Sequence, residues 1–295
     1  MTTKTAMITI AGRPNVGKST LTNYLVGEKI AIVSNKPQTT RNRICGIVTK
    51  ENTQYVFVDT PGFHKSRTKL GDYMVNIARD SIADVDLTIL VVEPIASVGP
   101  QEQGLIDHLA SHKCPAILAI NKIDTVEKES LLSVIDIYSK AAPFAAIIPI
   151  SAKTGDGIEL LLAECDKYAV VSPFLFPEDS TTDQPERQVM AEIIREKILW
   201  CLDREIPHGT AVEITKFSER DSGIIDIDAT IYCEKASHKG IIIGKHGDML
   251  KKISSMARAD CEKFMGTRVY LTTWVKVKEN WRDSDFLVRN FGYRE

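Results

Sequence analysis

The sequence of 295 residues predicts an α/β unit with a mostly parallel sheet, followed by a smaller α+β unit. Three observations lead to this fold class. Short β-branched apolar runs alternate with longer helical patterns as far as about residue 170. A segment that contains three prolines and an acidic cluster then interrupts the periodicity. The pattern after this segment has a different order of elements, so we expect a second unit.

The first unit, residues 1–170, contains the alternating pattern. We expect strands at 6–11, 44–48, 55–58, 87–92, 116–120 and 146–150, and helices after Gly17, Lys69, Gly99, Glu127 and Gly157. Helices between successive strands would cover both faces of the sheet, and ligands bind such sheets at the carboxyl ends of the strands.

Residues 171–186 form the expected linker, and the second unit spans residues 187–295. Its helical periodicity at 188–204 is followed by alternating strands at 211–217 and 223–233, with a turn at 219–223. A helix is expected at 249–265 and a last strand at 268–277.

The formal net charge of −2 gives no sign of a polycation, but the second unit is locally basic. Between Lys235 and Lys278 there are ten lysines and arginines and three acids. Six widely spaced cysteines without a C-x-x-C pair indicate small buried hydrophobes in a reducing cytosol. No apolar run approaches the roughly 20 residues of a membrane span, so we expect a soluble, intracellular protein.

A phosphate-binding loop is predicted between the first strand and the first helix. The segment matches G-x-x-x-x-G-K-[ST], whose amides surround phosphates while its lysine reaches the β- and γ-phosphates and its serine ligates Mg²⁺. The expected nucleotide-binding residues here are Gly12, Arg13, Pro14, Asn15, Val16, Gly17, Lys18, Ser19 and Thr20.

Three more segments complete the predicted nucleotide site. D-T-P-G ends a strand, which places Asp59 near the metal and the Gly62 amide opposite the γ-phosphate. N-K-x-D lets Asp124 accept two hydrogen bonds from guanine, which favours GTP over ATP. S-A-K is expected to give a backbone amide to the guanine carbonyl. The expected residues are Asp59, Thr60, Pro61, Gly62, Phe63, Asn121, Lys122, Asp124, Ser151, Ala152 and Lys153.

These motifs, in this order, resemble the translation-factor-related class of small GTPases. The resemblance implies a threonine that ligates Mg²⁺ and contacts the γ-phosphate, for which Thr40 is our choice and Thr39 the alternative. It makes Lys18, Thr40 and Gly62 the expected catalytic residues, and Ser19, Thr40 and Asp59 the Mg²⁺ ligands.

One position departs from the Ras pattern, because Phe63 stands where Ras-like enzymes carry a glutamine that orients water. We therefore expect slow intrinsic hydrolysis. In related GTPases with a hydrophobic residue at this position, the asparagine equivalent to Asn15 helps to ligate K⁺. Whether K⁺ at Asn15, Arg41 or a partner supplies the positive charge stays open.

In the second unit, the segment I-I-I-G-K-H-G before a helix resembles the G-x-x-G loop of a KH domain, which binds single-stranded nucleic acid. The order helix-strand-strand before the loop and helix-strand after it is that of the type II KH domain. The expected RNA-binding residues are Ile241, Ile242, Ile243, Gly244, Lys245, His246, Gly247, Lys251 and Lys252.

A P-loop GTPase domain followed by a type II KH domain resembles the Era family of bacterial GTPases over essentially the whole chain. Further local similarity lies at 176–179, 192–197 and 274–278. The resemblance implies a monomeric cytoplasmic factor that binds single-stranded RNA near the 3′ end of small-subunit ribosomal RNA, assists maturation of that subunit, and associates peripherally with the inner face of the membrane.

Two other functions remain open at this point. One is a constitutive RNA-binding module whose GTP site is structural, and the other is a GTPase of the membrane surface. The tandem-GTPase Der family is disfavoured, because the chain has a single P-loop motif.

Overall fold

The computed structural model describes residues 2–62, 68–81 and 85–293, and it divides into two compact units. The second unit begins at Gln184, and it also includes Ile32–Thr39 and the described residues 68–72. Phe63 lies outside the described residues. None of the described helices is long and apolar enough to cross a membrane.

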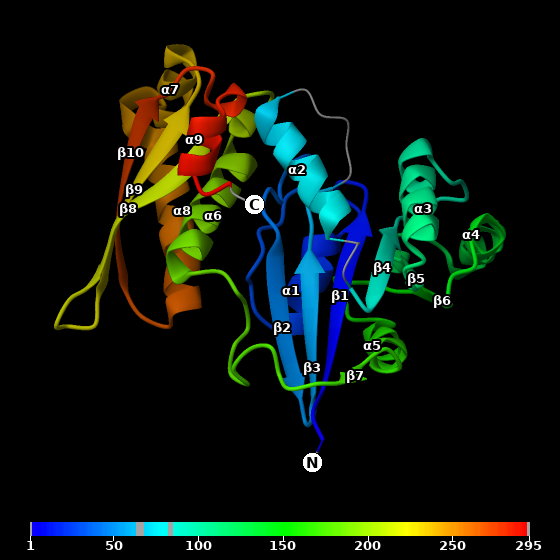
Figure 1. Ribbon diagram of the computed structural model, residues 1–295. Coiled ribbons are helices and arrows are strands. Elements are labelled where there is room, and N and C mark those ends of the chain that lie inside the picture. The colour runs from blue at the N-terminus through cyan, green and yellow to red at the C-terminus, as the bar shows by residue number, and fades with distance from the viewer. Residues whose placement is uncertain (1, 63–67, 82–84, 294–295) are drawn as a thin grey trace. The chain divides into compact units, whose positions relative to one another are not determined.

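The sheet of the first unit has the strand order β2-β3-β1-β4-β5-β6, with β7 paired to β1 (Figure 1). All neighbours on this path are parallel except β2 and β3. The strands are β1 (Lys4–Gly12), β2 (Ile44–Lys50), β3 (Thr53–Asp59), β4 (Leu87–Val92), β5 (Ala116–Ile120), β6 (Ala146–Pro149) and β7 (Val170–Val171). The expected mostly parallel sheet is confirmed, and the short β7 is an addition.

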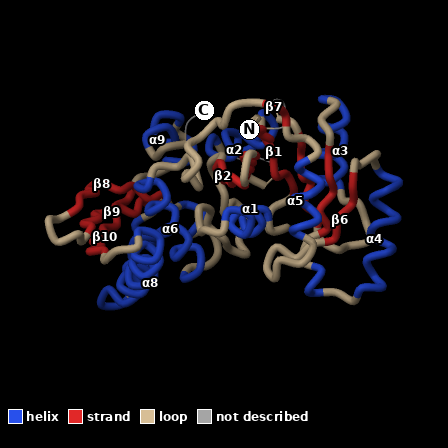
Figure 2. The backbone as a smooth tube through the Cα atoms, turned by 90° about the horizontal axis from the view of Figure 1, so that it is seen from below, coloured by secondary structure: helices blue, strands red, loops and turns tan. Residues whose placement is uncertain are grey.

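Helices cover both faces of this sheet (Figure 2). One apolar cluster joins α1 and α5 to the sheet, and a second joins α3 and α4 to its other face. The helices are α1 (Lys18–Val26), α2 (Lys69–Asp80), α3 (Pro100–His112), α4 (Lys128–Ala141) and α5 (Ile158–Asp166), as the periodicity predicts. The motif loops therefore follow the carboxyl ends of β1, β3, β5 and β6.

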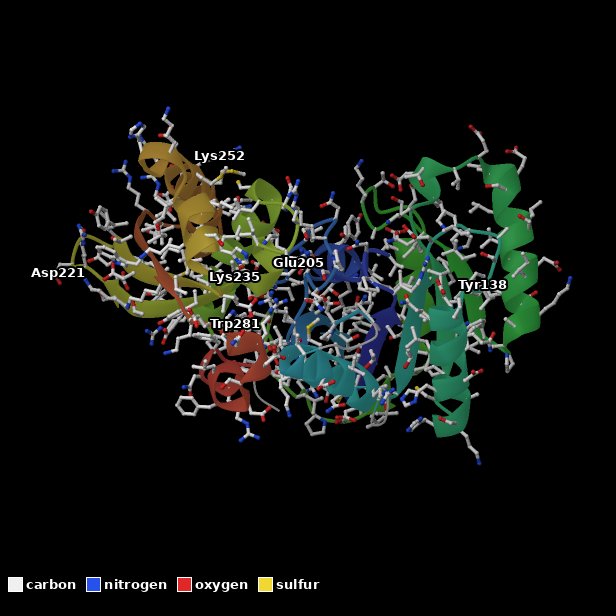
Figure 3. The ribbon with its side chains drawn as sticks, turned by 90° about the horizontal axis from the view of Figure 1, so that it is seen from above. Tyr138, Glu205, Asp221, Lys235, Lys252 and Trp281 are labelled. Carbon is white, nitrogen blue, oxygen red and sulfur yellow. The ribbon has the colours of Figure 1, made fainter. Side chains whose placement is uncertain are left out.

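The second unit packs helices against one face of a three-stranded sheet with the order β10-β9-β8. Its strands β9 and β10 are parallel, and β8 is antiparallel to β9. The elements are α6 (Glu186–Cys201), β8 (Ala211–Glu219), β9 (Ile225–Cys233), α7 (Ala236–Ile243), α8 (Asp248–Met265), β10 (Val269–Val277) and α9 (Asp285–Asn290). Trp281 is fully buried near the C-terminal segment, with its ring 5.2 Å from that of Phe291 (Figure 3).

Helix α6 buries three charged residues. Arg195, Glu196 and Lys197 are consecutive, charged and at most 1% exposed. The Lys197 ammonium lies 2.7 Å from a Glu196 carboxylate oxygen and 2.5 Å from one of Asp260 on α8. Because buried charges are tolerated only when they are paired, this network explains how α6 is buried on several sides.

The segment Ile32–Thr39 is held by this charged part of α6 within the second unit. The Val33 amide donates to Glu196 Oε1 over 2.9 Å, and the Val33 carbonyl accepts from Trp200 Nε1 over 2.9 Å. The Arg195 guanidinium donates to the Thr39 carbonyl. Both ends of the segment are therefore fixed by side chains of the second unit.

Candidate functional site

The phosphate loop lies between β1 and α1, and its two glycines are required by geometry. Gly17 has a φ of 102°, and a Cβ there would lie 2.2 Å from Asn121 Nδ2. At Gly12 a Cβ would lie 2.5 Å from the Val91 carbonyl oxygen. Any other residue would clash with these groups, so the close packing of the loop requires glycine at both positions.

Lys18 is buried at the base of this loop, with 6% of its surface exposed. Its ammonium donates to the carbonyls of Gly12 and Arg13 over 3.1 and 2.9 Å. Burial lowers the pKa of Lys18 to about 8, and the charge of Asp59 partly offsets that effect. A phosphate group would stabilise the charged form of this lysine.

Three side-chain oxygens converge next to Lys18. Ser19 Oγ lies 2.7 Å from Asp59 Oδ2 and 2.8 Å from Thr40 Oγ1, and the last two oxygens are 3.5 Å apart. Asp59 Oδ1 is buried, with no hydrogen-bond partner among the described residues. Burial raises the pKa of Asp59 to about 6, against the opposing charge of Lys18. A hard cation such as Mg²⁺, which prefers oxygen ligands, fits this group.

The two candidate threonines have different surroundings. Thr39 Oγ1 donates to the Lys36 carbonyl over 2.6 Å and lies 2.7 Å from Ser34 Oγ. Only Thr40, of the two, directs its hydroxyl to Ser19 and Asp59. The geometry therefore favours Thr40. Arg41, the next residue, is 1% exposed.

The D-x-x-G motif lies against the phosphate loop. A Cβ at Gly62 would come 2.7 Å from the Pro14 amide nitrogen and 2.8 Å from its Cα. Thr60 Oγ1 donates to the Ile10 carbonyl over 3.1 Å, which ties the motif to β1. Because Gly62 has no side chain, its backbone can lie close to the phosphate loop.

Asn121 joins the phosphate loop to both base-recognition motifs. Its Nδ2 donates to the Val16 carbonyl over 2.8 Å, and its Oδ1 accepts from the Ala152 amide over 2.9 Å. The Ala152 amide is thus already engaged within the protein. The expectation that S-A-K gives a backbone amide to the guanine carbonyl stays a prediction, and this bond shows how Asn121 holds the S-A-K backbone in place.

Asp124 and Ser151 lie together at the exposed end of the site. Ser151 is fully buried, and its hydroxyl donates to Asp124 Oδ1 over 2.7 Å. This bond orients the carboxylate that is expected to read guanine. Lys153, the last residue of S-A-K, is exposed.

Glu93 lies outside all of the predicted motifs but contacts two residues of the expected nucleotide site. It follows β4 directly, and its Oε1 lies 2.5 Å from the Lys122 ammonium. Its Oε2 lies 3.4 Å from an Arg13 nitrogen, and Lys122 also donates to the Asn15 carbonyl over 2.7 Å. The feature of the sequence that could have indicated Glu93 is an acid directly after a predicted strand, at the sheet edge where the other motifs lie.

The G-x-x-G loop of the second unit joins α7 to α8. Gly244 and Gly247 have φ angles of 76° and 85°, and His246 has a φ of 54°. A Cβ at Gly244 would lie 2.7 Å from Met249 Cβ, whereas one at Gly247 would meet nothing within 4 Å. Lys245 and His246 are exposed, so the loop is an open surface.

The structure corrects one expected RNA contact. Ile242 is fully buried in the apolar core of the second unit, so its side chain cannot reach a ligand. Ile241 is 49% exposed and Ile243 is half-buried. Lys251 and Lys252 on α8 are exposed, and Figure 3 labels Lys252 on this helix.

Comparison with known proteins gives a separate family match for each of the two units. Residues 7–122 match the family model described as 50S ribosome-binding GTPase, and residues 205–282 match that of the KH domain. The GTPase Era of Ruminiclostridium cellulolyticum is 53% identical over 100% of this chain and 99% of its own. That of Alkaliphilus oremlandii is 52% identical over 99% and 100%.

Two solved structures are also similar. One is of Era in complex with MgGDPNP and nucleotides 1506–1542 of 16S ribosomal RNA, with a TM-score of 0.95 and 37% identity over 99% of this chain and all of that one. The other, Aquifex aeolicus Era bound to GDP·AlF4⁻, has the same TM-score, identity and coverage.

The fold and the site define a GTPase with a P-loop domain and a KH domain. The identity over the full length of both curated relatives shows the family. The chain belongs to the Era family of GTPases.

Proposed function

We propose that this GTPase is a nucleotide-driven switch that binds the single-stranded 3′ region of small-subunit ribosomal RNA and assists maturation of that subunit. The observation that carries the proposal is the pairing of two features in one chain. One is the buried oxygen group of Ser19, Thr40 and Asp59 beside the phosphate loop, and the other is the exposed loop 244–247. The relative that was solved with MgGDPNP and 16S ribosomal RNA supports this assignment.

The roles proposed for the nucleotide-site residues follow from their positions. Lys18 neutralises phosphate charge, and the Gly62 amide faces the γ-phosphate. Ser19, Thr40 and Asp59 would hold Mg²⁺, which would offset the charge of the phosphates. The Asp124 carboxylate, oriented by Ser151, accepts hydrogen bonds from guanine.

The test of the switch is the RNA affinity of the full chain in complex with GDP and with a non-hydrolysable GTP analogue. A switch requires a clear difference, since a ligand shifts an equilibrium only by its differential affinity for two states. Equal affinities would leave a constitutive RNA-binding module. Co-sedimentation with separated 30S and 50S particles tests the target, because the matching family model is described by the 50S particle.

The proposal includes a role for K⁺ at Asn15 as a source of positive charge in the transition state. The Asn15 backbone is already fixed, with a φ of 66° and its carbonyl bonded to Lys122. GTP turnover in KCl should exceed turnover in NaCl at equal ionic strength. Asn15→Gly should remove the difference without backbone strain, and Asn15→Ala is the matched variant that adds such strain. Equal rates in both salts would leave Arg41 or a partner as the source.

We place the protein in the cytoplasm as a monomer, with peripheral contact to anionic lipid through its basic region at 235–278. The surplus of lysine and arginine there supports the lipid contact. Flotation with anionic vesicles at moderate salt is the test, and a protein that stays at the bottom of the gradient would contradict the lipid contact.

A further inference from the structure

Strand β10 of the KH unit exposes an uncovered row of side chains. It is one of the two edge strands of its sheet (Figure 1), and Val269, Val275 and Val277 on its inner face pack in the apolar core. Because side chains alternate along a strand, the residues between them point away from α8. This outer row consists of Arg268, Tyr270, Thr272, Trp274, Lys276 and Lys278.

Two large aromatic rings dominate the outer row. Tyr270 is 60% exposed and Trp274 is 59% exposed. A single exposed apolar side chain is ordinary, but two large rings on the same face of one strand form a stacking surface. The Arg220 guanidinium lies 5.3 Å from the centre of the Tyr270 ring, which adds a cation beside it.

The charges around the rings are arranged for a polyanion. Arg268 lies at one end of the row, and Lys276 and Lys278 lie at the other. On β9, Asp228 is opposite Thr272, and Asp226 is opposite Tyr270. Asp226 is already paired with Arg220 at 2.5 Å and with Lys216 at 3.4 Å.

We infer that the outer face of β10 is a second binding subsite for single-stranded RNA, in which Tyr270 and Trp274 each stack a base and the flanking cations contact phosphates. The inference rests on the proposed RNA-binding function and extends it. A rise of about 3.3 Å per residue separates the rings by roughly 13 Å, so they hold bases that are not neighbours in one stack.

This subsite is distinct from the G-x-x-G loop. The loop precedes α8, and α8 packs on the inner face of the sheet through Ile253 and Ala257. A KH loop holds about four nucleotides, so an RNA longer than that can reach a second surface. The outer row of β10 supplies one.

An anionic membrane fits the same row less well. Lipid insertion requires a continuous apolar face, whereas the residues between and beside the two rings are polar. Thr272 separates the rings on β10, and its register partner on β9 is Asp228. A base needs only the face of each ring, so the polar surroundings are compatible with RNA.

The test uses the full chain and two single-stranded RNAs of one sequence type, about four and about 12 nucleotides long. The double variant Tyr270→Thr/Trp274→Thr keeps the β propensity of the strand. It should lose about 10- to 100-fold in affinity for the longer RNA and keep its affinity for the shorter one. The matched variant Tyr270→Phe/Trp274→Phe, which retains both rings, should stay close to wild type.

A second readout is tryptophan fluorescence, since stacking of a base on Trp274 quenches it. The longer RNA should quench the wild type, and Trp274→Phe should remove most of that quenching. Wild-type affinity of the threonine double variant for the longer RNA would overturn the inference. If the threonine double variant loses flotation with phosphatidylglycerol vesicles while its RNA binding is unchanged, the inference is also overturned. If the wild type binds neither RNA, the proposed function itself fails.

Discussion

The phosphate loop and the G-x-x-G loop solve a similar backbone problem in opposite surroundings. In each, a glycine with positive φ directly precedes a helix, at Gly17 before α1 and at Gly247 before α8. A Cβ at Gly17 would lie 2.2 Å from Asn121 Nδ2, whereas one at Gly247 would have open space. Packing and backbone conformation thus both disfavour other residues at Gly17, whereas backbone conformation alone does so at Gly247.

The lysines of the two loops also differ in burial. Lys18 is buried and bonded to two loop carbonyls, whereas Lys245 is exposed. A small ligand with fixed geometry is best held by preorganised buried groups. A flexible polymer needs an open backbone and accessible charge. The buried phosphate loop thus suits a small ligand, and the open G-x-x-G loop suits a polymer.

The largest effect is expected for Gly17→Ala. The new methyl group would displace the Asn121 side chain, which links the phosphate loop to both base-recognition motifs. GTP affinity should fall by roughly 1000-fold, about 4 kcal/mol, in titration calorimetry. The matched change Gly247→Ala adds only backbone strain of roughly 1–2 kcal/mol, so RNA affinity should fall by about 5- to 30-fold. Equal losses in the two loops would refute the comparison.

Asp124→Asn should change the base that the first unit selects. An amide can donate to xanthine, whereas a carboxylate only accepts from guanine. Loss of a charge-assisted bidentate contact should cost roughly 2–4 kcal/mol of GTP binding, about 30- to 1000-fold, with a gain for xanthosine triphosphate. Competition between the two nucleotides measures both changes, and unchanged GTP affinity would show that Asp124 does not read the base.

Lys245→Asp/His246→Asp should weaken RNA binding by about 10- to 100-fold, since it places two carboxylates at the open loop. The salt dependence of binding should become shallower. GTP affinity of the same protein is the internal control and should not change. RNA binding like that of the wild type would mean that the loop does not contact phosphates.

The smallest expected effect is on alkylation of cysteines, which tests how readily the first unit opens to solvent. Burial raises the pKa of Cys45 and of Cys165 to about 12, so at pH 8 both stay almost entirely as unreactive thiols. Iodoacetamide labelling, read by mass spectrometry, should modify half-buried Cys201 first and leave these two intact. Labelling should increase as pH rises toward 12. Early modification of Cys165 would show that the first unit opens readily.

Much of the molecule could be predicted from sequence, because local signals decide it. The mostly parallel sheet, the helix starts and the convergence of motif loops follow from alternation and from glycine positions. The bonds of Asn121 and the place of Glu93 did not follow, because they depend on which strand ends are neighbours. Those contacts are tertiary, and no pattern within one segment encodes them.

Burial was the harder property to predict in the second unit. Ile242 looked like part of a binding loop but belongs to the core. Arg195 and Glu196 are charged yet buried. Their charge partners Glu192 and Lys197 are close in sequence, whereas the segment Ile32–Thr39 that contacts them is distant. Charged residues are usually exposed, and a single sequence does not show which distant segment contacts a helix.

The hold of α6 on Ile32–Thr39 has a consequence for how the chain is made. During synthesis, the Thr39 carbonyl cannot accept its hydrogen bond from Arg195 until 156 more residues have been added. At the usual 5–20 residues per second of synthesis, that delay is roughly 8–30 s. During this time the first unit can form its sheet and phosphate loop, while the residues just before Thr40 lack their final partners. A ribosome producing this protein therefore carries a GTPase domain in which residues 32–39 reach their final contacts only after α6 has emerged.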